Sequence, residues 1–256
     1  GSVRVTNTGA MTVGGVTGSA TGMVATGPVY ITTNSPLTVG KKIKSDNDIV
    51  LTANDSLGDG DTLQINNGID LESLTRILLH AGDHLILSNT SLLRAPTVEI
   101  HTDDGSGGGA NGTIELYGTI NASTVDLYGG SGNDVFVITT TTAGSVTNVY
   151  GGTGNDTVYV GTNATRTSNT GGTANLINGK LVVNGQGGND ALVVDETGET
   201  AAISLTLDRE TIGATTYGRL VGLANSNVLF ETTEAVDVNL GNQGNTVQIK
   251  STQASA

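Results

Sequence analysis

Three glycine-rich loops carry the residues of this sequence that are best suited to chemistry. They read GGSGND over residues 129–134, GGTGND over 151–156 and GQGGND over 185–190. Glycine reaches positive φ at little cost, so successive main-chain carbonyls can turn to one side, and the Asp that ends each loop adds a carboxylate. Calcium prefers oxygen ligands of these two kinds. The sequence therefore predicts calcium binding by Asp134, Asp156 and Asp190, with further candidate ligands at Gly129, Ser131, Asn133, Gly151, Thr153, Asn155, Gly185, Gly187 and Asn189.

A single loop of this kind supplies fewer oxygens than the roughly six to eight that calcium takes. The Asp134 and Asp156 loops are 22 residues apart, so in a coil of that length they lie side by side and can share an ion. We expect about one to three such sites. The alternative is that each loop only forms a corner, its Asp accepting main-chain N–H groups in a turn. Asp61 and Asp83 lack such glycine loops and are expected to be turn residues.

A repeated strand pattern must position these loops. The unit is D-x-U-x-U, where U is aliphatic or aromatic, and it begins at Asp61, Asp83, Gly112, Asp134, Asp156 and Asp190, with 22 residues as the commonest spacing. Side chains alternate along a strand, so each U faces inward and the residue between them faces outward, as for Phe136 and Val137. A fixed period in the low twenties predicts an all-β parallel β-helix, or β-solenoid, with coils of about 22 residues and on the order of 11 coils. Residues 70–79 could instead form a short helix.

Composition and charge limit the partners. The 256 residues include 38 glycines, no cysteine and only 3% aromatic residues. The net charge of −13 argues against nucleic acid, whose binding depends on Lys and Arg, and favours cations. The sequence contains no run of about 20 apolar residues, which a transmembrane helix would need, and we expect no export signal at its N-terminus. We expect the chain to be a fragment of a longer protein.

The loop sequences resemble a known calcium-binding repeat. GGSGNDVFV and GGTGNDTVY are similar to the RTX nonapeptide GGxGxDxUx, whose loops bind calcium, although RTX repeats recur every nine residues. Residues 1–105 resemble filamentous-haemagglutinin-type coils, and residues 106–256 continue the β-helix with RTX-like loops, as in very large repetitive bacterial exoproteins. These resemblances imply that the chain is a right-handed parallel β-helix. They also imply that it is a structural or adhesive segment of an extracellular or cell-surface protein. Surface glycans, or a host or neighbouring cell surface, are then possible partners.

No arrangement of residues predicts catalysis, and we expect a non-enzyme. The arginines are scattered relative to the loops, and the acidic group Glu99, Asp103, Asp104 and Glu115 reads best as a solvated face. His80, His84 and His101 do not predict a zinc site, because the His80–His84 spacing suits a helix rather than strands and no pattern nearby supplies a third ligand. Tyr117, Tyr128 and Tyr150 should point outward, and Tyr128 should stack on Tyr150. The alternative function is therefore a carbohydrate-binding or polysaccharide-degrading β-helix that uses these tyrosines.

Overall fold

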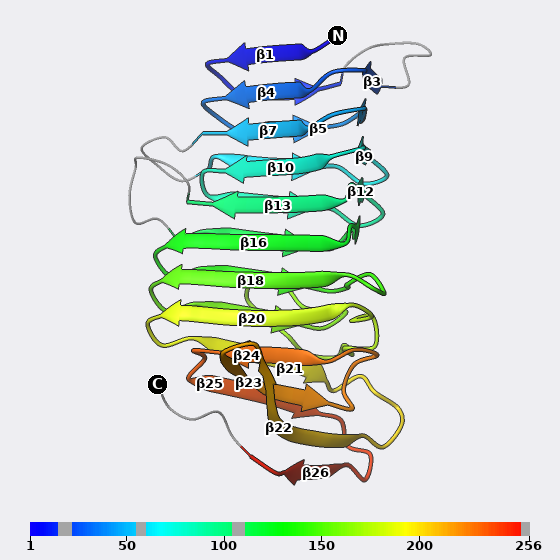
Figure 1. Cartoon of the computed structure of the whole chain (residues 1–256), viewed down its shortest axis with the longest axis vertical. Coiled ribbons are helices and arrows are strands. Elements are labelled where there is room, and N and C mark those ends of the chain that lie inside the picture. The colour runs from blue at the N-terminus through cyan, green and yellow to red at the C-terminus, as the bar shows by residue number, and fades with distance from the viewer. Residues whose placement is uncertain (15–21, 55–59, 104–110, 252–256) are drawn as a thin grey trace.

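The computed structural model describes residues 1–14, 22–54, 60–103 and 111–251. Its regular elements are all strands, with no helix in the described ranges, and they form three sheets whose strands follow one another along one axis (Figure 1). Sheet A begins with nine parallel strands: β1 (Val3–Asn7), β4 (Val29–Thr33), β7 (Ile49–Ala53), β10 (Arg76–Ala81), β13 (Thr97–Thr102), β16 (Thr124–Ser131), β18 (Val146–Thr153), β20 (Lys180–Gly187) and β24 (Val228–Glu231).

Sheet B runs parallel throughout and carries the D-x-U-x-U units. Its strands are β2 (Met11–Val13), β5 (Leu37–Val39), β8 (Thr62–Ile65), β11 (His84–Leu87), β14 (Thr113–Leu116), β17 (Val135–Ile138), β19 (Thr157–Val160), β21 (Ala191–Glu196) and β25 (Ala235–Leu240). The first U of each unit lies in one register column, which is Leu63, Leu85, Ile114, Phe136, Val158 and Leu192. All six are at most 3% exposed, so the predicted alternation and pairing of these strands are confirmed.

Sheet C is shorter and lies beside the first levels only, where a level is one strand of sheet A with the sheet B strand that follows it. It contains β3 (Gly22–Ala25), β6 (Lys42–Ser45), β9 (Asp70–Ser73), β12 (Leu92–Arg94) and β15 (Thr119–Asn121), all parallel. Inward side chains from the three sheets meet in one apolar core. Residues 70–79, for which a helix was the alternative, form β9 and most of β10.

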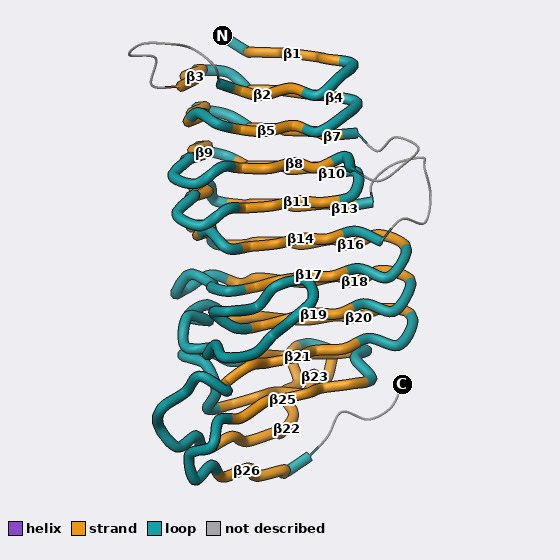
Figure 2. The backbone as a smooth tube through the Cα atoms, turned by 180° about the vertical axis from the view of Figure 1, so that it is seen from behind, coloured by secondary structure: helices purple, strands orange, loops and turns teal. Residues whose placement is uncertain are grey.

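Two predicted outward residues, Val137 and Glu115, are buried. Val137 is 0% exposed, although its position in β17 points away from the core. The cause is residues 161–179, which link β19 to β20 and fold back over the outer face of sheet B (Figure 2). Arg166 of this segment reaches Glu115 of β14, with Nε 3.5 Å from Oε1. We name residues 161–179 the covering segment.

Insertions also explain why the stack has fewer levels than the period predicts. Nine parallel strands of sheet A are described, not 11. The covering segment and a hairpin of β22 (Ser204–Ile212) and β23 (Thr215–Val221) contain residues that would otherwise form further levels. The hairpin ends sheet A with two antiparallel pairings, and β26 (Thr246–Ile249) then pairs parallel to β22. Parallel pairing runs unbroken from β11 to β14 and from β13 to β16, on either side of residues 104–110, which contain the expected boundary at 105.

Candidate functional site

The Asp residues that end the glycine loops form one column at the start of neighbouring sheet B strands. Asp134, Asp156 and Asp190 immediately precede β17, β19 and β21, and they are 1%, 2% and 4% exposed. One carboxylate oxygen of each accepts a main-chain N–H of the preceding level: Gly112 N lies 2.5 Å from Asp134 Oδ1, Asp134 N lies 2.8 Å from Asp156 Oδ1, and Asp156 N lies 2.8 Å from Asp190 Oδ1. The column therefore ties successive levels together.

The second oxygen of each carboxylate is buried without a hydrogen-bond partner in the described structure. This holds for Oδ2 of Asp134, Asp156 and Asp190 alike. Burial raises the pKa of Asp134 to about 7 and that of Asp156 to about 6, against the opposing effect of the N–H bonds, and neighbouring carboxylates raise both further. Burial also raises the pKa of Asp190. A buried carboxylate oxygen without a partner is costly, which marks these atoms as places for a proton or a cation.

The first glycine of each loop is required by close packing around that oxygen. A Cβ added at Gly129 would collide with Asp134 Oδ2 and with the main-chain oxygen of Gly151 in the next level. The same collision would occur at Gly151, with Asp156 Oδ2 and Gly185 O, and at Gly185, with Asp190 Oδ2 and the main-chain oxygen of Thr232. Each loop thus brings an unpartnered carboxylate oxygen and a carbonyl oxygen of the next level to the same glycine. Oxygens of these two kinds fit a hard cation.

The second position of each loop needs a left-handed backbone. Gly130 has φ of 103° and Gly152 has φ of 111°, values that glycine adopts without strain. In the third loop Gln186 occupies this position at φ of 71°. The third loop therefore keeps the shape of the other two at some conformational cost.

Several predicted ligands are instead engaged in bonds between levels. Ser131 donates both its N–H and its hydroxyl to Asp103 Oδ2, at 3.0 and 2.6 Å. The asparagine oxygens form a second ladder beside the Asp column: Asn133 Oδ1 accepts Asn155 N–H at 2.7 Å, and Asn155 Oδ1 accepts Asn189 N–H at 2.8 Å. The main-chain oxygens of Thr153 and Gly187 accept the N–H groups of Gly132 and Gly154. These residues shape the loops, and the free oxygens belong to the aspartates.

Asp61 and Asp83 provide a comparison without a glycine loop. Asp83 Oδ2 accepts the main-chain N–H groups of Gly60 and Asp61, at 2.6 and 2.8 Å, so it bonds to the preceding level, as the aspartates of the column do, and not to its own turn as expected. Neither of its oxygens is left buried and unpartnered. In the described ranges no group of three His, Asp or Glu side chains is placed to hold a metal. A cation in the column would therefore depend on main-chain carbonyls as well as carboxylates.

Two acidic positions of importance were missed by the sequence reasoning. Glu234 Oε2 accepts Asp190 N–H at 2.7 Å and so continues the column by one level. Glu234 lies 44 residues after Asp190, twice the 22-residue period, and begins the unit EAVDV, so allowing Glu in the pattern would have found it. Glu196 is 0% exposed and accepts Ala174 N–H of the covering segment at 3.0 Å. Burial raises the pKa of Glu196 to about 7.

The aromatic residues form a ladder on the outer face of sheet A. Rings of His80, His101, Tyr128 and Tyr150 stack in succession, with centroid separations of 4.8, 4.5 and 4.9 Å. The predicted stacking of Tyr128 on Tyr150 is thus confirmed, whereas Tyr117 follows β14 of sheet B and lies outside the ladder. Tyr128 has both ring faces covered by its neighbours.

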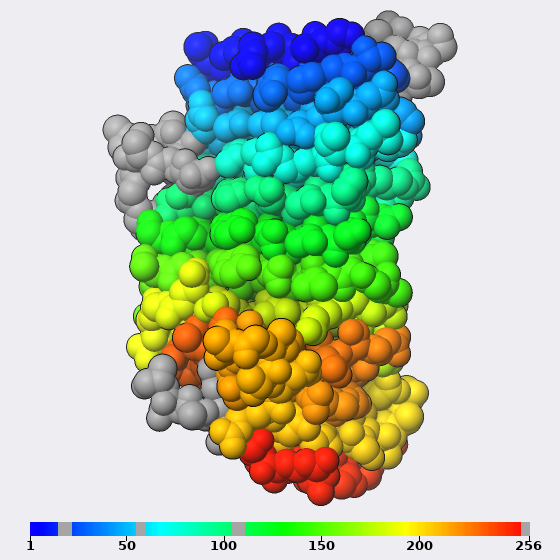
Figure 3. All heavy atoms as spheres, viewed as in Figure 1, coloured from blue at the N-terminus to red at the C-terminus, as the bar shows by residue number. Residues whose placement is uncertain are grey.

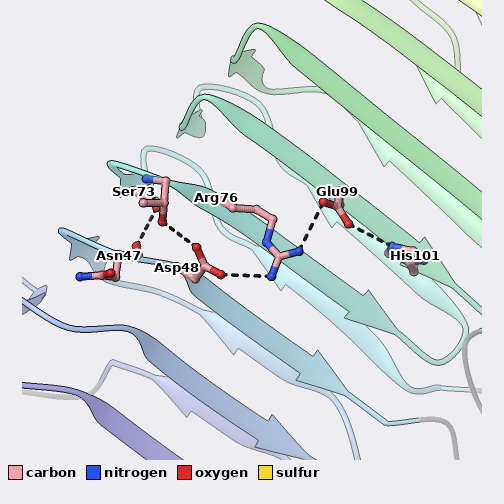
Figure 4. A network of polar contacts seen from close by, with 7 residues as sticks. Asn47, Asp48, Ser73, Arg76, Glu99 and His101 are labelled. Carbon is pink, nitrogen blue, oxygen red and sulfur yellow. Dashed lines mark hydrogen bonds and ion pairs between the residues drawn. The ribbon is translucent and has the colours of Figure 1, made fainter.

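An ion-pair network borders the ladder (Figure 4). Arg76 lies between Asp48 and Glu99, with nitrogen–oxygen distances of 3.1 and 3.5 Å, and Glu99 lies 3.9 Å from His101. Glu99, Asp103 and Glu115 of the predicted acidic group each have a separate partner, in Arg76, Ser131 and Arg166. Asp104 lies outside the described residues. The three described acidic side chains therefore do not converge on one site, and Asp103 and Glu115 are buried and do not form the expected solvated face.

Comparisons of the chain with protein-family models, with curated proteins and with solved structures found no match. A search of the described residues for a helix long and apolar enough to cross a membrane found none.

Proposed function

We propose that this chain is a non-catalytic structural segment, a right-handed parallel β-helix whose coils are tied together by calcium at the Asp column. The observation that carries the proposal is the repeated unpartnered Oδ2 of Asp134, Asp156 and Asp190, each buried beside a glycine and a carbonyl oxygen of the next level. One such atom could be an accident of packing. Three such oxygen atoms at successive levels, each with the same glycine contact, support a common role in binding a cation.

Electrostatics support a cation at these positions. Burial raises the pKa values of Asp134 and Asp156 to about 7 and about 6, so at pH 7 Asp134 is close to half protonated and Asp156 retains a smaller protonated fraction. A divalent ion binds the charged carboxylate and stabilises that form, so its binding would release protons from the aspartates. The net charge of −13 adds a general preference for cations. When bound, calcium would neutralise the column and link adjacent coils.

The residues that would hold calcium are fewer than the loops contain. The three aspartates would contribute Oδ2, and Gly151, Gly185 and Thr232 would contribute the main-chain oxygens packed against them. The Asn ladder would preserve the loop shape, because its side-chain oxygens already accept N–H groups. Weak affinity, of the millimolar order seen in extracellular modules, suits a site with few carboxylates.

We place this segment in a large secreted or cell-surface bacterial protein, where it would act as a structural or adhesive rod. Support comes from the extended stack of parallel strands and from the calcium available outside cells. The carbohydrate alternative is less favoured, because sugar stacking needs a free ring face and both faces of Tyr128 are covered. A glycan array and a polysaccharide depolymerisation screen would test it, and a structural rod should be negative in both.

Calorimetric titration of the purified chain with CaCl2 tests the proposal directly. We expect saturable binding of about one to three ions, proton release at pH 7, and a thermal midpoint that rises with calcium. The double variant Asp134→Ala, Asp156→Ala should lose most of the binding while circular dichroism still shows strands. The proposal is wrong if the wild-type chain gives neither binding heat nor a shift in midpoint.

A further inference from the structure

The turn that joins β8 to β9 exposes an asparagine followed by a glycine. Ile69 N–H donates to Asn66 O at 3.2 Å, so the chain reverses over two residues, with Asn67 and Gly68 at the tip. Both tip residues are exposed, and Gly68 has φ of 71°, in the left-handed region that glycine adopts without strain. A Cβ added at Gly68 would meet no atom within 4 Å. The peptide between the two residues is therefore open to water.

An asparagine that precedes glycine can react with its own main chain. The glycine nitrogen gives up its proton and bonds to the asparagine Cγ, and the side-chain nitrogen leaves as ammonia, so a succinimide forms. Water then opens the succinimide at either carbonyl, which gives aspartate or isoaspartate. The attack needs a glycine N–H without a hydrogen bond and an asparagine side chain that is free to turn, and glycine favours it because no Cβ crowds the nitrogen.

Both reacting groups are free at this turn. Within the described structure, neither the side-chain amide of Asn67 nor the main-chain N–H of Gly68 makes a hydrogen bond. The hydrogen bond of the turn joins its two flanking residues, and Asn66 N–H also donates to Val39 O of the preceding level, at 3.0 Å. The flanks are thus tied to the stack while the tip is left unbonded, which is the arrangement that the reaction requires.

The sequence contains three further Asn–Gly pairs, and the fold holds two of them through the glycine nitrogen. In the pair at residues 111–112, Gly112 N–H donates to Asp134 Oδ1 at 2.5 Å. In the pair at residues 178–179, Gly179 N–H donates to Thr141 Oγ1 at 2.8 Å. Each nitrogen must lose its hydrogen bond before it can attack the neighbouring side chain.

The last pair is held through its asparagine. Asn184 Nδ2 donates to Glu231 Oε1, and Asn184 Oδ1 accepts the hydroxyl of Thr232, both at 2.7 Å. Asn184 also lies within β20, between strands of the neighbouring levels, and Figure 3 shows successive levels packed directly on one another. This side chain can turn toward Gly185 only after the local structure opens.

We propose that Asn67 is a site of spontaneous modification, which water converts to aspartate and isoaspartate through a succinimide, while the fold protects the other three Asn–Gly pairs. A hydrogen bond that must first open slows the reaction by about fivefold or more. Isoaspartate adds a carbon to the main chain at the tip, so the bond from Ile69 N–H to Asn66 O should weaken. This inference does not depend on calcium, because the turn follows β8 whereas the Asp column precedes the strands of sheet B.

Peptide mapping by mass spectrometry over a time course at pH 8 makes the test, with isoaspartate detected by enzymatic methylation. In the folded chain Asn67 should convert first, and the other three pairs about fivefold or more slowly. In denaturant the four rates should converge, because all four pairs then lose their protection. Asn67→Gln should remove most of the ammonia released by the folded chain. Asn66→Gln is the matched control, because Asn66 lies in the same turn but does not precede a glycine, and it should release ammonia as the wild type does.

Two results would overturn the proposal. One is a folded chain in which the four pairs convert at equal rates, or in which Asn111, Asn178 or Asn184 converts before Asn67. The other is an Asn67 that stays intact in the folded chain while it converts in denaturant, which would show that the turn holds the side chain away from Gly68 N. Circular dichroism of both Gln variants should match that of the wild type, because neither side chain contributes a hydrogen bond to the stack.

Discussion

Replacement of Asp156 by Asn separates the two roles of the Asp column. Asn keeps an oxygen that can accept Asp134 N–H and exchanges the unpartnered Oδ2 for an amide, which can donate to Gly185 O. The variant therefore preserves the bond between levels and removes only the buried charge. Asp156 is 2% exposed, so solvent screens that charge little.

The magnitude follows from the pKa of Asp156. Burial raises this pKa from 3.8 to about 6, so ionisation is harder in the folded chain than in the unfolded one. Native stability is therefore lost as the pH rises from about 4 through about 6, and at pH 8 the cost reaches about 3 kcal/mol. In chelator at pH 8, Asp156→Asn should be more stable by up to that amount, or roughly 6–12 °C in thermal midpoint.

Calcium should reverse part of this advantage. A site at ten times its Kd adds about 1.4 kcal/mol to the stability of the wild-type chain, and the variant gains less because Asn carries no charge. Thermal denaturation at pH 5 and pH 8, each in chelator and in calcium, gives the thermal midpoint under all four conditions. Asp83→Asn is the matched control, because Asp83 is equally buried in a turn without the glycine loop, and it should keep the full calcium gain. The reasoning is refuted if Asp156→Asn is less stable than wild type in chelator at pH 8, or if it retains the whole calcium gain.

Further predictions test the neighbouring residues. Gly151→Ala should lower stability by about 2 kcal/mol or more and abolish calcium binding locally, because the added Cβ collides with two oxygens, whereas Gly9→Ala, in open space, should be neutral in denaturant titrations. Glu196→Gln should flatten the fall in stability of the chelated chain between about pH 5 and 7, since burial raises the pKa of Glu196 to about 7, and a variant that keeps the wild-type pH profile would contradict this. Asn155→Ala should cost about 1 kcal/mol in thermal or chemical unfolding by leaving the Asn189 N–H without its acceptor, and no loss would show that the Asn ladder is dispensable.

Local pattern was enough to predict six of the nine strands of sheet B, which are β8, β11, β14, β17, β19 and β21. Alternation in the D-x-U-x-U unit determines which face of a strand is apolar, and a constant period puts equivalent residues of successive levels side by side. For this reason the register of Phe136 on Val158 and the stacking of Tyr128 on Tyr150 could both be predicted from spacing alone. The same spacing placed Asp134 beside Asp156, and the repeated strand unit, rather than the period, aligned Asp190 with them.

The tertiary structure decided what each oxygen of that column does. In Asp134, Oδ1 accepts a main-chain N–H and Oδ2 is buried without a hydrogen-bond partner. Residue spacing does not predict this difference between the two oxygens. It also assigns Ser131 to Asp103, 28 residues earlier, because the loops of neighbouring levels overlap in space. The burial of Val137 depends on the covering segment, which interrupts the period and folds back over an outer face. Periodic sequence therefore determined the strands and their neighbours, whereas contacts made by insertions and by individual oxygens arise only when the whole stack is assembled, because they join residues with no regular spacing.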